Sequence, residues 1–481
     1  MMHGMLFRKW RVWGSVAGLL LLGASLRLWF LHHANPFSGD AQIYGSFARN
    51  LLTHHVYSFA AEPGPFPPSL IRLPGYPLFL VACFVIAGVG NFAAALRIQI
   101  AVDLASCLML AELAREMFGR RAALVCLLLG CLCPFTANYT AAPLTETLTL
   151  ASITVTFFCF HRWQRQSGFG NAWVFGIGAG LAASLLLRPE QALLSVAVLP
   201  AMVLIALRRC KAYAAEGARV SPRVFAPALI AAVCLVLPLV PWTARNWRTF
   251  HVLQPLAPRY ATDPGEAVPL GFQRWYRSWA IDFASTEEVY WNYDGTAIAL
   301  ADLPARAFDS LDQRRQTAKL LEDYNLTTSP SPQLDARFEA IARERIARSP
   351  ARYYVFLPLA RLGNMLLRPR TELTGIQLAW WRWRDSHAQT IMGAALGSVN
   401  LLYLVLGMMG WRRWRRLADS EDRVLLRAMT AFVLLRCALL FTLDNSEPRY
   451  TLEFFPVLIL WASALAARRR PISSGLSSSR S

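Results

Sequence analysis

The sequence of 481 residues has few charged side chains. Only 16% of the residues are charged, whereas 55% are hydrophobic. Soluble globular domains contain about 45–50% apolar residues and about 25% charged residues. A soluble chain could not bury this much apolar surface, so the composition favours a multi-span membrane protein.

The cysteine patterns of zinc sites and disulfide frameworks are also absent. The nine cysteines include no CxxC pair and no Cys/His cluster with zinc spacing. Nearly all of them lie within or beside apolar runs, where a free thiol behaves as a small hydrophobic side chain. We therefore expect no disulfide framework.

Acidic residues are scarce at the N-terminus, since none precedes Asp40. The formal net charge is +19, which by itself could suit a nucleic-acid partner. However, most arginine clusters lie at the ends of apolar runs, where the cytoplasmic membrane surface favours them. The distribution of the arginines therefore predicts that the basic clusters contact membrane lipid and that the protein binds no nucleic acid.

Ten apolar segments are long enough to cross a bilayer, which takes about 20 residues. The first segment lacks a clean small-residue cleavage site, so we interpret it as a retained span and not as a signal peptide. The predicted spans are 11–31, 93–117, 121–138, 143–160, 172–188, 190–207, 224–243, 388–410, 424–443 and 449–467.

Basic clusters fix the orientation of these spans. With ten spans, every cluster falls on one side, as the positive-inside rule requires. These clusters lie at 8–11, 115–121, 162–165, 208–211, 412–416 and 468–470. If 74–90 or 352–367 crossed alone, the later clusters would move outside, so both are expected to lie along the outer face. Alternatively, both segments cross the membrane, and the second crossing returns the later clusters to their original side. The expected number of transmembrane helices is therefore about 10–12.

The outer face then collects a first loop (32–92) and a large segment (247–387). The large segment contains about half of the acidic residues and reads as a small, water-facing, non-cytoplasmic region of short helices. The predicted organisation is an N-terminal membrane module with the first loop, this outer region, C-terminal helices and a disordered tail, with bounds 1–246, 247–387, 388–470 and 471–481.

Two carboxylates, Asp40 and Glu146, lie where predicted spans leave the membrane on the outer side. They could serve as a general base or as metal ligands. The alternative for Asp40 is that it caps a helix beginning near Ala41, and Glu146 could simply occupy the first turn of its helix. Asp103 and Arg436 lie inside predicted spans, where charge is costly and often functional.

Several motifs follow one another in an order that resembles a known family. These are "DAQIY", "RLPGYPLFL", "LLRPEQALL", "PWTARNWRTF" and "EPRYTLEFFPVLIL". In this order they resemble GT-C fold glycosyltransferases of the family 39 type, relatives of protein O-mannosyltransferases and of the aminoarabinose transferase that modifies lipid A. The resemblance implies an all-α, polytopic, GT-C-like fold and an enzyme that takes a sugar from a polyprenyl phosphate on the non-cytoplasmic face.

The resemblance also implies roles for individual residues. Asp40 matches the first-loop acid that acts as base or organises the acceptor, and Glu146 matches the second outer acid. Relatives often have Asp-Glu where this chain has Asp-Ala at 40–41, which weakens the expectation of a divalent metal there. Arginine suits phosphate because its planar fork binds two oxygens. Substrate contacts are expected from Tyr44, Arg72, Tyr76, Arg188, Glu190, Arg245, Glu447, Arg449 and Tyr450.

Two alternatives to a glycosyltransferase stay open. A transporter or flippase of an amphipathic or anionic solute would use Asp103, Arg436 and the outer arginines, although the paired repeats of such proteins are not found in the sequence. A non-catalytic assembly factor would leave the placement of Asp40 and Glu146 unexplained. We expect a bacterial inner membrane with the site on the periplasmic face, whereas the sugar and the acceptor are not encoded in any motif.

Overall fold

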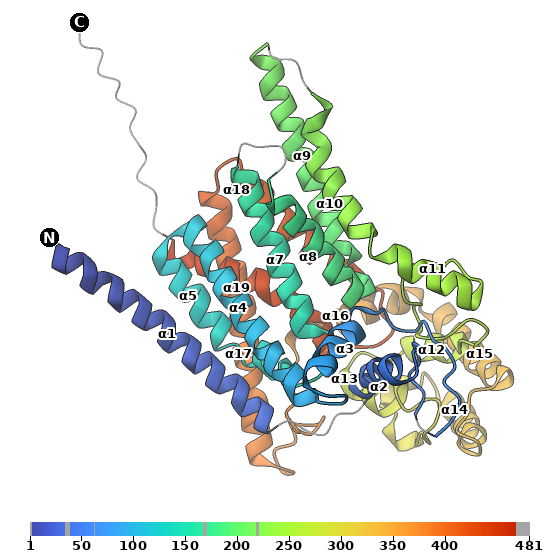
Figure 1. Cartoon of the computed structure of the whole chain (residues 1–481). Coiled ribbons are helices and arrows are strands. Elements are labelled where there is room, and N and C mark those ends of the chain that lie inside the picture. Colours follow the sequence, from blue (N-terminus) through green and yellow to red (C-terminus); the bar gives the residue numbers. More distant parts are fainter. Residues whose placement is uncertain (1, 34–38, 62, 167–170, 218–220, 468–481) are drawn as a thin grey trace, which may run out of the picture.

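The computed structural model describes residues 2–33, 39–61, 63–166, 171–217 and 221–467, with side chains from residue 13 onward. The described residues form helices joined by turns and loops, which confirms the predicted all-α class (Figure 1). The tail 471–481, Arg468–Arg470 and the side chains of the basic cluster 8–11 lie outside this part of the chain.

Seven helical segments are long and apolar enough to cross a membrane, and each coincides with one of the ten predicted spans. They are Trp13–His32, Phe92–Phe118, Pro189–Ala215, Pro222–Phe250, His387–Leu417, Asp422–Phe441 and Pro448–Ala466. The main helices within them are α1 (Met2–His32), α4 (Phe92–Phe118), α9 (Ala192–Ala215), α10 (Ala226–Val236), α11 (Leu239–Phe250), α17 (His387–Leu417), α18 (Asp422–Phe441) and α19 (Phe455–Ser463), with the 3-10 turn η7 (Pro448–Phe454) before α19.

The other three predicted spans are helical but shorter or more polar. Segment 121–138 forms α5 (Arg120–Cys131) and α6 (Pro134–Tyr139), because the helix ends before Pro134. Segment 143–160 is α7 (Glu146–Arg165), whose many Ser and Thr side chains are buried. Segment 172–188 is the 15-residue α8 (Trp173–Leu187). Both α7 and α8 pack within the bundle, so neither needs a fully lipid-compatible surface.

The two segments expected at the outer face are short helices. Helix α3 (Gly75–Ala87) has 13 residues, about 20 Å of rise, which is less than the bilayer core. Val85 and Ile86 of α3 are 68% and 84% exposed, as a helix lying against lipid would be. Segment 352–367 ends in α16 (Leu357–Leu367), which is also too short to cross.

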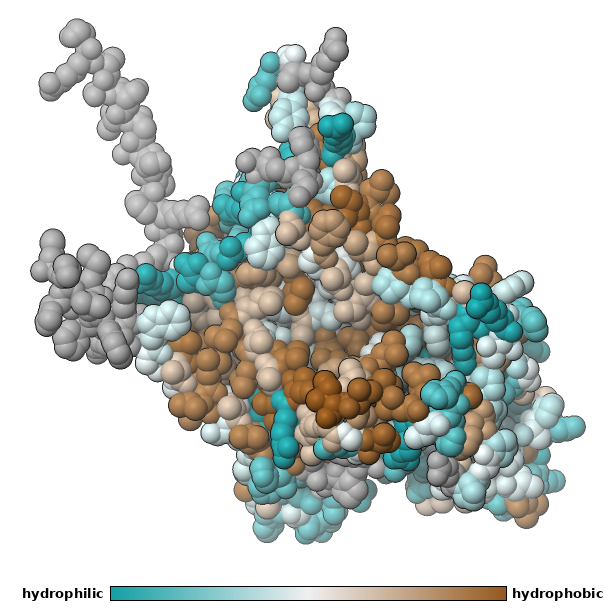
Figure 2. Space-filling model, viewed as in Figure 1, coloured by the Kyte–Doolittle hydropathy of each residue, from teal (hydrophilic) through white to brown (hydrophobic). Residues whose placement is uncertain are grey.

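The outer region has a hydrophobic core of its own. Helices α12 (Leu270–Arg277), α13 (Phe283–Ser285), α14 (Leu311–Asn325) and α15 (Pro332–Arg348) surround aromatic side chains that include Phe272, Trp275, Tyr276, Trp279 and Phe338. Figure 2 shows hydrophobic side chains in brown over the middle of the molecule and paler or teal side chains over this region. The distribution fits a membrane bundle carrying a water-facing region.

Candidate active site

Asp40 is the first residue of α2 (Asp40–Thr53), and its carboxylate lies between two arginines. Arg72 Nη2 donates to Oδ1 of Asp40 at 2.7 Å, and Arg449 Nη2 donates to Oδ2 at 2.7 Å. Asp40 does not cap the helix, because Gly39 occupies the N-cap position and no side chain caps α2. The carboxylate instead joins the first outer loop to the C-terminal helices.

The two arginines determine the charge state of Asp40. Burial by itself raises the pKa of Asp40, but the Arg449 and Arg72 guanidinium groups lower it well below its usual range. The side chains of Asp40, Arg72 and Arg449 are 21%, 24% and 17% exposed. Asp40 is therefore an ionised group that solvent can reach, and it binds protons weakly while both arginines hold it.

Glu146 begins α7 and is 2% exposed. Arg188 Nη1 donates to its Oε1 at 3.0 Å, and Arg449 Nε lies 3.9 Å from the same oxygen. Arg449 therefore contacts both acids that the sequence singles out, so Asp40 and Glu146 belong to one network. Oε2 of Glu146 has no hydrogen-bond partner among the described residues, which leaves a buried acceptor available.

Arg188 is the centre of the deeper half of the network. It lies between α8 and the short 3-10 turn η1 (Pro189–Gln191), in the "RPEQ" motif. Its Nε is 2.7 Å from Oε1 of Glu190 and 3.3 Å from Oε1 of Glu453. The tight turn thus aims one guanidinium group at three carboxylates from three different segments.

Glu453 is a member of this network that sequence reasoning missed. It lies in η7 with 1% exposure and pairs with Arg436 of α18, which is also 1% exposed. The sequence places Glu453 inside the apolar run "TLEFFPVLIL", which has the pattern of an ordinary transmembrane helix. An ionisable residue within a span is itself a signal for function, and that rule would have found it.

Glu447 precedes η7 and contacts Arg449. Burial raises the pKa of Glu447 to about 7, with the Arg449 guanidinium opposing and the Asp40 charge adding to the shift. Its Oε2 has no hydrogen-bond partner in the described chain. Glu447 is therefore the carboxyl group of the network that can gain or lose a proton near neutral pH.

The network is close to charge balance. It contains five carboxyl groups (Asp40, Glu146, Glu190, Glu447 and Glu453) and four guanidinium groups (Arg72, Arg188, Arg436 and Arg449). Protonation of Glu447 would make the buried set neutral, which lowers the cost of holding charges away from water.

Three predicted tyrosines border the network. The ring of Tyr44 meets that of Tyr76 edge to face at 5.2 Å, and burial together with the nearby Asp40 charge raises the pKa of Tyr44 to about 12. The Tyr76 hydroxyl donates to Oε1 of Gln99 at 2.6 Å. Tyr450 lies under Arg188 and Arg449, 5.5 and 5.7 Å from their guanidinium carbons.

Arg245 and Asp103 lie elsewhere. Arg245 donates to the Ser69 carbonyl at 2.8 Å and packs over aromatic rings such as Trp242, so the structure does not bring it to the acids. Asp103 accepts from Arg27 Nε at 2.6 Å in a fully buried pair. The negative charge of Asp103 within the membrane is therefore paired with Arg27 inside the bundle. The positive charge of Arg436 is paired with Glu453 and belongs to the acidic network.

Within the described chain, no three His, Cys, Asp or Glu side chains come together in a way that could hold a metal ion. The acids of the network face arginines.

Comparison with known proteins supports the resemblance seen in the motifs. Residues 68–242, about a third of the chain, match the family model described as dolichyl-phosphate-mannose-protein mannosyltransferase. The matched segment contains Arg72, Tyr76, Glu146, Arg188 and Glu190, and it confirms the predicted resemblance to this family. No curated protein sequence gave a significant match.

Solved structures similar to this chain include membrane transferases. The archaeal oligosaccharyltransferase AglB from Archaeoglobus fulgidus, in complex with an inhibitory peptide and a dolichol-phosphate, matches at 11% identity and a TM-score of 0.47, over 96% of this chain and 50% of that chain. ArnT from Cupriavidus metallidurans bound to undecaprenyl phosphate matches at 12% identity and a TM-score of 0.38, over 89% and 77%. This chain spans about half the length of the archaeal enzyme.

Proposed function

We propose that the protein is a membrane glycosyltransferase that moves a sugar from a polyprenyl-phosphate donor to an acceptor hydroxyl on the non-cytoplasmic face, in a bacterial inner membrane. The observation that carries the proposal is Asp40 held between Arg72 and Arg449 at 2.7 Å each. Arg72 lies in the segment 68–242 that matches the family model, whereas Asp40 and Arg449 lie outside that segment. Asp40 contacts both arginines.

The chemistry follows from the charges. A donor phosphate can take the bonds that Arg72 and Arg449 now make to Asp40, because both arginines are partly exposed and bind oxygens well. Asp40 then loses the two cations that lower its pKa and becomes a better proton acceptor. The arginines thus couple donor binding to activation of the base.

The transfer itself is a single displacement. The acceptor oxygen forms a bond to the anomeric carbon, the bond from that carbon to the phosphate oxygen breaks, and Asp40 takes the acceptor proton. The electron pair leaves on the polyprenyl phosphate, whose charge the arginines stabilise. Because attack and departure occur on opposite faces, the anomeric carbon inverts.

The transporter alternative has less support in this arrangement. Its sequence evidence was charge at mid-membrane, but Asp103 pairs with Arg27 and Arg436 pairs with Glu453.

The test is Asp40→Asn in the purified full-length chain, assayed with labelled polyprenyl-phosphate sugars. Loss of a general base lowers rates by about 10²–10⁴-fold, so we expect transfer to fall by at least about 100-fold while the protein stays inserted and folded. Asp323→Asn is the matched control, because Asp323 pairs with Arg337 at 2.6 Å on the exposed outer region. Unchanged turnover in Asp40→Asn would exclude Asp40 as the base.

A further inference from the structure

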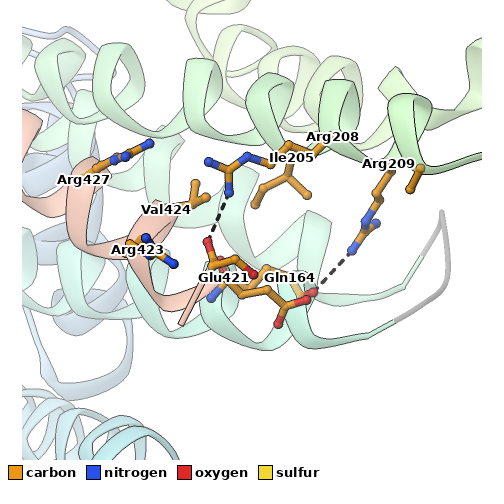
Figure 3. A pocket seen from close by; sticks show the side chains of 10 residues that line it. Gln164, Ile205, Arg208, Arg209, Glu421, Arg423, Val424 and Arg427 are labelled. Atoms are coloured by element: carbon orange, nitrogen blue, oxygen red, sulfur yellow. Dashed lines mark hydrogen bonds between the residues drawn. The ribbon is translucent and has the colours of Figure 1, made fainter. Parts of the chain in front are cut away.

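A basic cavity lies at the opposite end of the bundle from the acidic network. It has a volume of about 430 Å³ and is bordered by α7, α9 and α18 (Figure 3). Its charged lining consists of Arg208, Arg209, Arg423, Arg427 and Glu421. Four guanidinium groups against one carboxylate make it a strongly positive site.

The same helices connect the two ends. Helix α7 begins at Glu146 and reaches Gln164 at the cavity, a rise of about 27 Å. Helix α9 follows Glu190 and reaches Arg208, while α18 begins beside Arg423 and leads to the Glu447 loop. Because about 30 Å is the thickness of the hydrocarbon core, the cavity lies at the other membrane surface.

Three of the four cavity arginines bond to backbone carbonyl groups. Arg208 Nη1 donates to the Ser420 carbonyl at 3.1 Å, Arg209 Nη2 to the Gln164 carbonyl at 3.3 Å, and Arg423 Nε to the Asp419 carbonyl at 3.1 Å. None of the four arginines forms a salt bridge within the described residues. Glu421 lies 3.6 Å from Arg165, a guanidinium group that it shares with Asp419 and Asp422.

An independent observation points to a missing polar partner. Gln164 lines the cavity and is 3% exposed, yet neither its Oε1 nor its Nε2 has a hydrogen-bond partner in the part of the chain that is described. A buried amide without partners is costly. In Figure 3, Gln164 lies among the arginine side chains, where a bound phosphate ester could accept from its Nε2.

Exposed apolar side chains continue from the cavity toward the bilayer. On α9, Leu207, Val203 and Val196 are 46%, 37% and 53% exposed, and on α18 Leu434 is 64% exposed. A ligand held by the arginines could therefore lay acyl chains along these helices. A free phosphate ion has no acyl chains that could pack on this apolar surface.

We propose that this cavity binds the headgroup of an anionic membrane phospholipid, with its phosphate on the four arginines and Gln164 and its acyl chains along α9 and α18. Basic pockets between transmembrane helices on the cytoplasmic side are suited to such headgroups. The site is separate from the proposed donor site, because it lies at the other end of the same helices.

The test is a native mass spectrometry titration of the purified full-length protein with dioleoyl phosphatidylglycerol, dioleoyl phosphatidylcholine or inorganic phosphate. We expect one phosphatidylglycerol to be retained at least about tenfold more tightly than phosphatidylcholine. The variant Arg208→Gln/Arg423→Gln/Arg427→Gln should lose this preference. Equal binding of the two lipids, or binding of inorganic phosphate as tightly as lipid, would overturn the proposal.

A matched control separates a built site from general charge attraction. The variant Arg120→Gln/Arg412→Gln/Arg416→Gln removes three exposed arginines from the same end of the bundle outside the cavity, and it should bind phosphatidylglycerol like the unchanged chain. A loss equal to that of the cavity variant would also overturn the proposal. Arg427→Glu is a second variant that changes a single residue, and it should leave the fold intact because Arg427 is exposed and makes no ion pair among the described residues.

Discussion

Glu447 shows how a single buried carboxyl group can make stability depend on pH. Its pKa is about 7 in the folded chain, against an ordinary value of 4.5. The folded state thus binds this proton more tightly than the unfolded state. The stabilisation is fully present below about pH 4.5 and is lost as the pH rises through about 7, which amounts to about 3 kcal/mol.

We therefore expect Glu447→Gln to flatten the pH dependence of stability. Between pH 5 and pH 8 the unchanged chain should lose about 2–3 kcal/mol of unfolding free energy more than the variant. The measurement is denaturant unfolding in detergent at both pH values, with Glu322→Gln on the exposed face of α14 as control. Parallel curves for Glu447→Gln and the unchanged chain would contradict the assignment of Glu447 as the titrating group.

The residues of the site were predictable where charge interrupts an apolar run at a predicted outer end. Asp40, Glu146, Arg188 and Arg449 all follow this rule, and the structure brings them together. Arg245 follows it too but packs on aromatic rings, because spacing along a chain does not say which way a side chain turns. The Arg27–Asp103 pair depends on contact between α1 and α4, which no local pattern encodes.

At the scale of elements, the packing of α7 on α8 sets the distance between Glu146 and Arg188. The "GIGAG" segment (176–180) has the GxxxG spacing that favours close helix packing. A Cβ added at Gly180 would lie 2.4 Å from Thr156 Oγ1, and one added at Gly176 would lie 2.5 Å from Cys159 Sγ. The two helices therefore meet where their side chains are smallest.

Gly180→Val should push α8 away from α7. Overpacking of this kind costs about 1–3 kcal/mol, and it should also lower transfer activity, because Arg188 follows directly on α8. Gly18→Val in α1 is the matched control, since an added Cβ there meets nothing within 4 Å. Thermal unfolding and the transfer assay check both effects. Equal behaviour of the two variants would mean that the α7–α8 contact does not constrain the site.

Across the whole molecule, the arginine-rich helix ends and the outer region lie at opposite ends of the bundle. Helix α7 leads from Glu146 at the acidic network to Arg165 beside the basic cavity, and the loop 442–447 carries α18 back to the network (Figure 1). The basic clusters described by the structure, such as 208–211 and 412–416, lie at the ends of α9 and α17. Arginine-rich ends stay in the cytoplasm during insertion, so the network and the outer region should face the other side.

This sidedness predicts two opposite protease patterns. A cleavage sequence inserted after Ser329, in the exposed turn between α14 and α15, should be cut in right-side-out spheroplasts and protected in inverted vesicles. The same sequence inserted after Ser420, in the turn between α17 and α18, should give the reverse. Each insertion serves as the control for the other, because both lie in short exposed turns. Cleavage of both from one side would refute an odd number of crossings between Ser329 and Ser420, and with it the placement of the outer region and the carboxylate network on the face opposite the basic turn.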